Sequence, residues 1–256
     1  MVIDISHKYI TKVQQLGEEF THNDGLGMWS GKEYHVHDCV IDMSECDNVD
    51  EAVAVTYGSS CTFERCVIRN ASKLCLIGSG DEKVRHREYD KKVSFYYCVL
   101  ENFGRRGVEA QSGMQVTMMN CLIKNWGSKD YFDVRNFASW SHDEAVIRAY
   151  NCIFMQDNFF RPIKQFFKDL GNHIGQAYNN EGIKALFKPS TYRLGVCRGL
   201  VATDTGKVYA SSCYKNHWWI CIQNHSDPME KYKAEELLEK LESMRNELSK
   251  KVKKDT

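Results

Sequence analysis

In the segment Val93-Ser-Phe-Tyr-Tyr-Cys98-Val-Leu100, an alternating apolar run leads into a cysteine and then into more apolar residues, and this pattern is the main evidence for the fold. Four other segments carry the same phrase: Tyr34-His-Val-His-Asp-Cys39-Val-Ile41, Cys61-Thr-Phe-Glu-Arg-Cys66-Val-Ile68, Val116-Thr-Met-Met-Asn-Cys121-Leu-Ile123 and Ile147-Arg-Ala-Tyr-Asn-Cys152-Ile-Phe154. Successive cysteines of the phrase are 27, 32, 23 and 31 residues apart. Such a period, with unequal insertions, is typical of one supersecondary unit per turn of a solenoid.

The two-residue alternation before each cysteine indicates a β-strand, because successive strand side chains point to opposite faces. Val93 and Phe95 share one face, and the cysteine three residues later breaks the alternation. A bend between two short strands explains the break, and after it Cys98 and Leu100 again share one side. The sequence therefore predicts an all-β fold, a right-handed parallel β-helix, in which the repeated cysteines stack as an interior ladder.

The stacked thiols are expected to pack as small hydrophobic groups, since the sequence has no C-x-x-C pair that would make a zinc or redox motif specific. Eleven cysteines are free thiols in this interpretation, because disulfide frameworks belong to domains too small to build a core. Three phrases continue to an asparagine four residues after the cysteine, at Asn70, Asn102 and Asn125. These asparagines are a second repeated feature of the turn.

The charges balance, with 34 basic and 34 acidic residues among 256. A chain with no net charge has no overall electrostatic field that would attract nucleic acid or a membrane surface. Any ligand therefore needs a local binding site. The amino terminus has no apolar run of signal-peptide length, and no span of about 18 apolar residues occurs elsewhere. We therefore expect a location in the cytoplasm or on a virion, unless the protein is secreted by a non-standard route.

Two regions are predicted along the chain. Residues 1–225 form the β-helix domain, with a short N-terminal segment and lateral loops, and residues 226–256 form a C-terminal α-helix. Asp227-Pro228 provides a cap and a first-turn proline, and the helix then carries an apolar stripe. The members of the stripe are Ala234, Leu237, Leu241, Met244 and Leu248. The stripe either mediates homo-oligomerisation or packs along the β-helix.

Three segments follow one another between about residues 35 and 125: Cys46-Asp-Asn-Val-Asp50-Glu-Ala-Val-Ala54, then Arg69-Asn-Ala-Ser-Lys73-Leu-Cys-Leu-Ile-Gly78-Ser-Gly-Asp81, then Asn102-Phe-Gly-Arg105-Arg106-Gly-Val-Glu109-Ala-Gln111. In order and spacing they resemble the D-G-x-x-D calcium segment, the H-D-H-D-K stretch with its G-x-S-D turn, and the Q-R-x-P-R-x-R segment of the family 1 pectate lyases. That family belongs to the right-handed β-helix superfamily.

The resemblance implies a polysaccharide lyase that cleaves a polyuronate, an acidic polysaccharide, by calcium-assisted β-elimination. Arg106 lies at the position of the base, and Lys73 at the position that contacts the substrate carboxylate. Asp50 corresponds to a Ca²⁺ ligand, with Glu51 beside it as a replacement carboxylate. Arg105 and Gln111 correspond to substrate-binding positions.

The sequence also departs from the family pattern. The second aspartate of the calcium segment falls on Ala54, an arginine of the last segment falls on Gln111, and another falls on Glu109. A second class of function therefore stays open, namely a noncatalytic carbohydrate-binding or structural β-helix such as a tail-spike or virion component. Arg106 would then simply pair with nearby carboxylates on the surface.

Two smaller features have open alternatives. His35 and His37 lie two residues apart on one strand and share its outward face, where they either hold a metal ion or are solvated. Aromatic residues after the fourth phrase either stack on sugar rings or pack a loop onto the body. They are Trp126, Tyr131, Phe132, Phe137 and Trp140.

Overall fold

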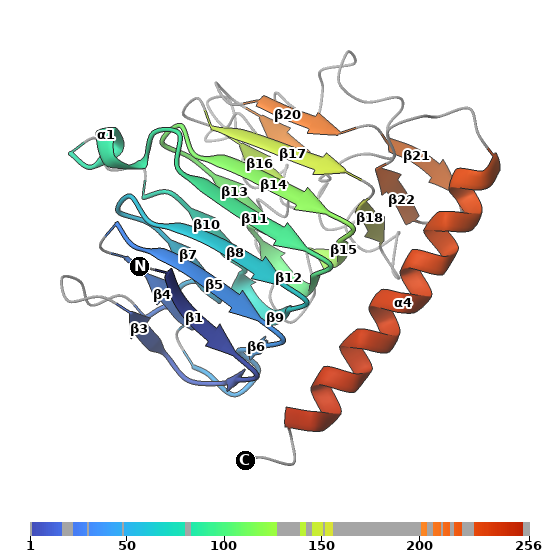
Figure 1. Ribbon diagram of the computed structural model, residues 1–256, viewed down its shortest axis with the longest axis horizontal. Coiled ribbons are helices and arrows are strands. Elements are labelled where there is room, and N and C mark those ends of the chain that lie inside the picture. The colour runs from blue at the N-terminus through green and yellow to red at the C-terminus, as the bar shows by residue number, and fades with distance from the viewer. Residues whose placement is uncertain are drawn as a thin grey trace, which may run out of the picture.

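Three sheets surround one core in the computed structural model, and a long helix lies along one side of them (Figure 1). The structure describes residues 2–16, 23–29, 31–47, 49–79, 83–126, 139–141, 145–150, 152–155, 201–203, 207–210, 212–215, 218–221 and 228–252. Each complete turn of the chain contributes one strand to each sheet, so the architecture is a right-handed parallel β-helix. The predicted fold class is confirmed.

Sheets A and B contain the repeated phrases. Sheet A consists of β1 (Val2–Ser6), β5 (Glu33–His37), β8 (Ser60–Glu64), β11 (Lys92–Tyr96), β14 (Gln115–Met119), β17 (Val146–Tyr150) and β20 (Lys207–Ala210). Sheet B consists of β2 (Tyr9–Ile10), β6 (Val40–Asp42), β9 (Val67–Lys73), β12 (Val99–Arg105), β15 (Leu122–Trp126), β18 (Cys152–Met155), β22 (Trp218–Cys221) and β21 (Ser212–Lys215). The pairs β18–β22 and β22–β21 are antiparallel, whereas the other pairs in these sheets are parallel.

Sheet C supplies a third strand to each turn, which the sequence phrases do not predict. Its members are β3 (Gln14–Leu16), β4 (Leu26–Met28), β7 (Val53–Val55), β10 (Cys75–Ile77), β13 (Val108–Ala110), β16 (Ser139–Ser141) and β19 (Val201–Thr203). These strands have three residues each, which is too short for a two-residue alternation to be recognised in the sequence.

The corner between sheets A and B places the cysteines inside the β-helix. The residue before each of four ladder cysteines has a positive φ of 52–55° (Asp38, Arg65, Tyr97 and Asn120). This left-handed conformation turns the chain sharply, and the cysteine that follows is fully buried. The Sγ of Cys98 donates to the carbonyl of Phe63 on the preceding turn at 3.5 Å. The cysteine ladder is therefore confirmed, with the thiols packed in the core and bonded to backbone.

A second ladder, made of asparagines, lies where the strands of sheet B bend. Asn70, Asn102 and Asn125 all have positive φ, between 54° and 61°. Asn102 Nδ2 donates to Asn70 Oδ1 at 3.5 Å, and Asn125 Nδ2 donates to Asn102 Oδ1 at 3.2 Å. Asparagine tolerates this conformation better than most residues, which explains its recurrence at this position of the turn.

The helix α4 (Pro228–Val252) packs on the outer face of sheet B. Its buried residues Leu237, Leu241, Met244 and Leu248 contact a row of apolar side chains, one from each turn. The row consists of Val40, Val67, Val99, Leu122 and Ile153. Of the two alternatives for the apolar stripe, packing along the β-helix is the one observed, and homo-oligomerisation stays a prediction.

A short helix, α1 (Arg85–Glu88), lies at the corner between sheets C and A. Glu88 is fully buried there and accepts hydrogen bonds from the backbone N–H groups of Tyr57 and Ser79, at 2.8 and 2.9 Å. Among the described residues, neither helix has the length and apolar composition needed to cross a membrane.

Candidate functional site

Four charged side chains occupy equivalent positions on successive turns, at the corner between sheets B and C. Each lies two residues before a strand of sheet C, and the four strands β4, β7, β10 and β13 pair in parallel register. The positions therefore stack as one column along the β-helix, two acidic residues followed by two basic ones: Asp24, Glu51, Lys73 and Arg106.

Backbone hydrogen bonds hold the first two turns of this column together. The N–H of Asp50 donates to the carbonyl of Asn23 at 2.8 Å, and the N–H of Gly25 donates to the carbonyl of Glu51 at 2.8 Å. The N–H of Glu51 donates to the Asp24 carboxylate at 3.3 Å. Asp24, Asp50 and Glu51 are thus fixed in position by the ladder between turns rather than by a loop.

Ion pairs connect the acidic and the basic halves of the column. Lys73 Nζ contacts the Asp50 carboxylate and lies 3.7 Å from Glu51 Oε1. The Arg106 guanidinium contacts Glu51, and its Nε lies 2.5 Å from Glu109 Oε2. We refer to Asp24, Asp50, Glu51, Lys73, Arg106 and Glu109 as the corner cluster. The predicted site residues Asp50, Glu51, Lys73 and Arg106 are therefore brought together.

Burial differs sharply within the corner cluster. The Glu51 side chain is 3% exposed, that of Lys73 is 22% exposed and that of Asp50 is 45% exposed. Burial, helped by the charges of Asp50 and Asp24, raises the pKa of Glu51 to about 8, although the charges of Arg106 and Lys73 act in the opposite direction. The effect of burial on this pKa therefore exceeds the opposing effect of the two basic groups.

The pKa of Asp50 is shifted in the opposite direction. Burial raises its pKa, but the hydrogen bond from Lys73 and the charge of Lys73 outweigh this effect, and the pKa lies below the ordinary value. Asp50 is consequently the carboxylate of the cluster that is both ionised and open to solvent.

The three carboxylates can together hold a cation. Asp24, Asp50 and Glu51 each offer one oxygen, and these oxygens all lie within 4.8 Å of one another. Carboxylate oxygens are the ligands that Ca²⁺ prefers. Asp24 was not among the predicted ligands; its signal in the sequence is that it precedes Leu26–Met28 by the same offset at which Glu51 precedes Val53–Val55.

Two other predicted positions lie elsewhere or are only partly described. Gln111 follows β13 at the opposite end from Arg106, is buried, and donates from Nε2 to the carbonyl of Gly78 at 2.7 Å. The backbone of Arg105 pairs with Lys73 in sheet B, and the Arg105 side chain lies outside the described part of the structure. Ala54 is buried in β7 and offers only backbone oxygen.

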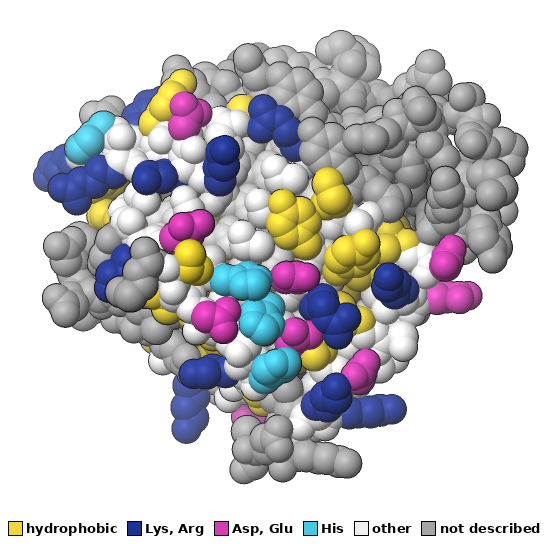
Figure 2. All heavy atoms as spheres, viewed as in Figure 1, with side chains coloured by type: hydrophobic (Ala, Val, Ile, Leu, Met, Phe, Trp, Pro, Cys, Tyr) yellow, Lys and Arg dark blue, Asp and Glu magenta, His cyan; other side chains and the backbone are white. Residues whose placement is uncertain are grey.

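The histidine pair faces outward from sheet A, as predicted, because Tyr34 and Val36 on the same strand point into the core. Figure 2 shows the face of sheet A, where histidine side chains gather with acidic and basic ones. This group is separate from the corner cluster, which lies between sheets B and C. Of the aromatic residues singled out in the sequence, Trp126 is buried at the end of β15. The side chain of Trp140 and residues 131, 132 and 137 lie outside what the structure describes.

No protein-family model matches the sequence, and no curated protein matches it significantly. The fold assignment therefore rests on the strand pairing, and any function has to be argued from the side chains.

Proposed function

We propose that the protein is a calcium-dependent polysaccharide lyase that cleaves a polyuronate at the corner cluster. The observation that carries the proposal is the convergence of Asp24, Asp50 and Glu51, within 4.8 Å of one another, on side chains of Lys73 and Arg106 from the next two turns. Carboxylates can bind Ca²⁺, and the two basic side chains beside them can bind the carboxylate of a sugar.

The donor set fits Ca²⁺. All three acidic side chains offer hard oxygen ligands, and Asp24 compensates for the missing carboxylate at Ala54. Ca²⁺ takes six to eight oxygens, so three side chains leave coordination positions for water and for a sugar carboxylate. When bound, the ion would draw charge from that carboxylate and so acidify the neighbouring C5–H of the sugar.

Lys73 is suited to orient the substrate. Its ammonium group is partly exposed and contacts the solvent-facing Asp50. A uronate carboxylate that arrives at this edge of the cluster can accept a hydrogen bond from Lys73 in addition to Asp50, because an ammonium group has three donors.

Arg106 has the role of the base in the proposed reaction. Elimination removes the C5 proton, forms the C4–C5 double bond and breaks the C4–O bond, and the leaving oxygen gains a proton. A guanidinium normally stays charged, and here it contacts the side chains of Glu51 and Glu109. The role of a base therefore requires additional positive charge beside the guanidinium, which Lys73 and a bound Ca²⁺ would supply.

The same pairing favours the second candidate, a noncatalytic β-helix that binds acidic carbohydrate or serves as a structural component. In that case Arg106 serves as an ion-pair partner of Glu51 and Glu109, and the cluster acts as a calcium-dependent contact for a polyuronate. The inward position of Gln111 also fits this candidate, since it removes one expected substrate contact.

The two candidates are separated by incubating the full chain with polygalacturonate or alginate and Ca²⁺ and following the ultraviolet absorbance of the unsaturated product. The lyase proposal expects elimination that EGTA abolishes and that Arg106→Ala reduces about 10²–10⁴-fold, the usual contribution of a general base. Arg87→Ala, on α1 at the corner between sheets C and A and so outside the cluster, is the matched control and should leave the rate unchanged.

Calcium-dependent binding of the polymer without elimination would identify the second candidate. Asp24→Asn tests the ion site in either case, because it removes one of the three carboxylate charges and should raise the Ca²⁺ concentration needed. Asp47→Asn, in the exposed loop before β7, is its control. Neither elimination nor binding with any of these polymers would contradict both the lyase and the carbohydrate-binding function and leave the structural role.

A further inference from the structure

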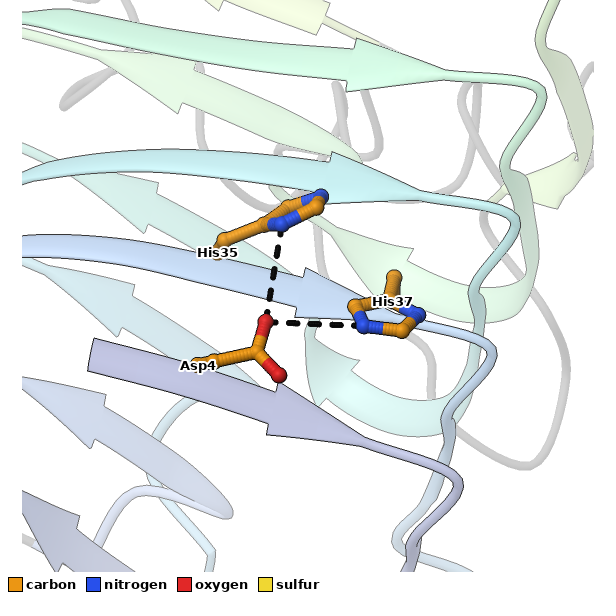
Figure 3. A group of neighbouring side chains, drawn as sticks. All are labelled: Asp4, His35 and His37. Atoms are coloured by element: carbon orange, nitrogen blue, oxygen red, sulfur yellow. Dashed lines mark ion pairs between the residues drawn. The ribbon is translucent and has the colours of Figure 1, made fainter. Parts of the chain in front are cut away.

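A group of histidines and carboxylates lies on the outer face of sheet A (Figure 3). Asp4 belongs to β1, and His35 and His37 belong to the neighbouring strand β5. The parallel register of β1 and β5 places Asp4 directly beside His35, and the alternation of the strand brings His37 to the same face. The backbone thus fixes the relative positions of all three side chains.

The three side chains converge on one point. Asp4 Oδ1 lies 3.5 Å from His35 Nδ1 and 3.4 Å from His37 Nε2. A tetrahedral Zn²⁺ ion with bonds of about 2.0–2.1 Å holds its ligand atoms roughly 3.3–3.4 Å apart. The two separations from Asp4 Oδ1 suit a single ion, and the three ligand atoms all lie within 4.8 Å of one another.

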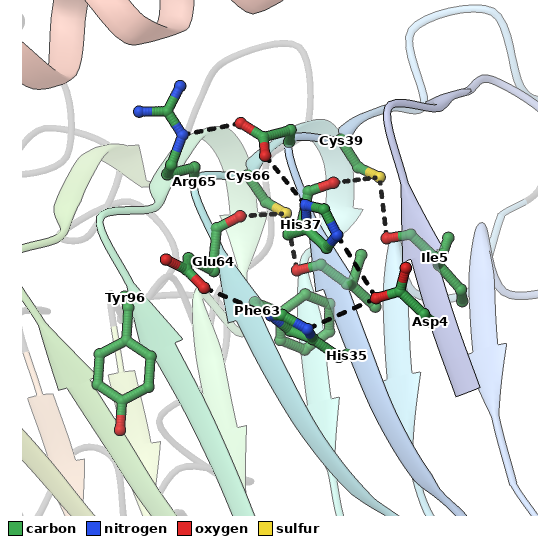
Figure 4. A network of polar contacts seen from close by, with 12 residues as sticks. Asp4, Ile5, His35, His37, Cys39, Phe63, Glu64, Arg65, Cys66 and Tyr96 are labelled. Carbon is green, nitrogen blue, oxygen red and sulfur yellow. Dashed lines mark hydrogen bonds and ion pairs between the residues drawn. The ribbon is translucent and has the colours of Figure 1, made fainter. Parts of the chain in front are cut away.

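The opposite nitrogen of each ring faces a further carboxylate (Figure 4). His35 Nε2 lies 3.4 Å from Glu64 Oε2, and His37 Nδ1 lies 3.0 Å from Asp38 Oδ2. Arg65 in turn donates to Asp38 Oδ1 at 2.8 Å and fixes its orientation. Histidines that bind metal ions usually donate their second N–H to a carboxylate or carbonyl, and here both rings have such a partner.

The hydrogen-bonding capacity of the rings leads to the same conclusion. A neutral imidazole has one N–H, and when this N–H faces Glu64 or Asp38 the other nitrogen presents a lone pair toward Asp4. Two lone pairs and a carboxylate oxygen then meet with no hydrogen between them. A cation at this point would satisfy all three groups.

We propose that Asp4, His35 and His37 form a binding site for a divalent transition-metal ion, Zn²⁺ in particular, with Glu64 and Asp38 orienting the two histidines. Imidazole ligands favour Zn²⁺ and its neighbours over Ca²⁺ and Mg²⁺, so this site differs in ion preference from the all-oxygen corner cluster. The side chains of Asp4, His35 and His37 are 57%, 36% and 26% exposed, so an ion from solvent can reach this site.

The test is a titration of the full-length protein with Zn²⁺ in competition with a chromophoric chelator, with the cysteines kept reduced. The hydrogen bond with Asp38 raises the pKa of His37, so the titration is run at about pH 8, above the ordinary imidazole pKa of about 6.5. We expect one tightly bound equivalent in the wild type. His35→Ala and His37→Ala should each weaken the affinity at least tenfold, and Glu64→Gln and Asp38→Asn about tenfold.

His86→Ala, on the exposed face of α1, is the matched control and should leave the affinity unchanged. Co²⁺ in place of Zn²⁺ reports the ligand type, because a site of nitrogen and oxygen ligands lacks the thiolate charge-transfer band of a cysteine site. The proposal is overturned if the wild type binds no Zn²⁺, if His35→Ala and His37→Ala bind it as the wild type does, or if the Co²⁺ form shows thiolate ligation. It is also overturned if His7→Ala abolishes binding while Asp4→Asn preserves it, since His7, His37 and Asp38 form an alternative grouping.

Discussion

Arg245 of α4 donates a hydrogen bond to Glu101 of β12, with 3.0 Å between the guanidinium nitrogen and Oε2, although 144 residues separate the two. The other oxygen of Glu101 lies 3.4 Å from Arg69, and the Glu101 side chain is only 5% exposed. Arg69 also contacts Asp42 and Ser249. The C-terminal helix is therefore held on sheet B by a largely buried polar network as well as by apolar contact.

Glu101→Ala should lower the free energy of unfolding by about 3 kcal/mol, because it leaves buried positive charge without one of its partners. Urea denaturation measures this change. Lys251→Ala removes a pair with Glu247 that is exposed on both sides, so it should leave the midpoint of urea denaturation nearly unchanged. Equal effects of the two substitutions would contradict the buried network.

Leu241→Ala should destabilise the protein by about 2–4 kcal/mol, since Leu241 is 1% exposed against the apolar row of sheet B and its truncation leaves a cavity. Glu239→Ala, on the exposed side of the same helix, should change the stability by no more than about 0.5 kcal/mol. Hydrogen exchange of the α4 amides should accelerate in Leu241→Ala alone. A helix that does not pack on the β-helix would show no difference between the variants.

Asn102→Ala should destabilise the protein by about 1–2 kcal/mol, because alanine loses the ladder hydrogen bonds and is strained at φ 54°. Asn102→Gly loses the same bonds without the strain and should be the more stable of the two variants. Thermal denaturation compares them. If alanine is tolerated as well as glycine, the left-handed bend is not maintained at this position.

The Asp42 carboxylate should contribute to acid sensitivity. Burial raises its pKa, but hydrogen bonds from Asn70 and Ser44 and the charge of Arg69 outweigh burial, so the pKa in the folded protein is lowered. A lowered folded pKa means that the stabilisation is complete above the unfolded value of about 3.9 and is lost as the pH falls from there toward the folded value. Unfolding free energies measured against pH should therefore differ between wild type and Asp42→Asn at neutral pH and converge in acid. Curves that stay parallel would exclude this role.

Much of the fold can be predicted from the sequence, because each turn repeats a local pattern. The alternation before Cys98 and the break at that cysteine specify two strands and a bend, and the structure has β11, β12 and a left-handed residue there. The residue directly after each cysteine is also apolar, and the strand pattern alone does not explain why. Val99 lies between two interior positions yet is fully buried, because it faces α4 on the other side of the sheet.

The candidate site could be predicted only in part. Asp50, Lys73 and Arg106 were identified through the resemblance of short motifs, and the structure brings them together in one cluster. Asp24 belongs to no repeated phrase, and only the pairing of β4 with β7 places it beside Glu51. Gln111 matched a motif position, but the turn after β13 directs its amide to Gly78 instead.

The solenoid follows from local sequence patterns, because the rules for strands, bends and buried thiols act within a few consecutive residues. Folding in three dimensions is what establishes which side chains meet across turns, which face α4 covers, and which carboxylates surround Glu51 or His35. Those contacts depend on the stacking register, and a register is a property of two strands together that neither strand's residues display alone.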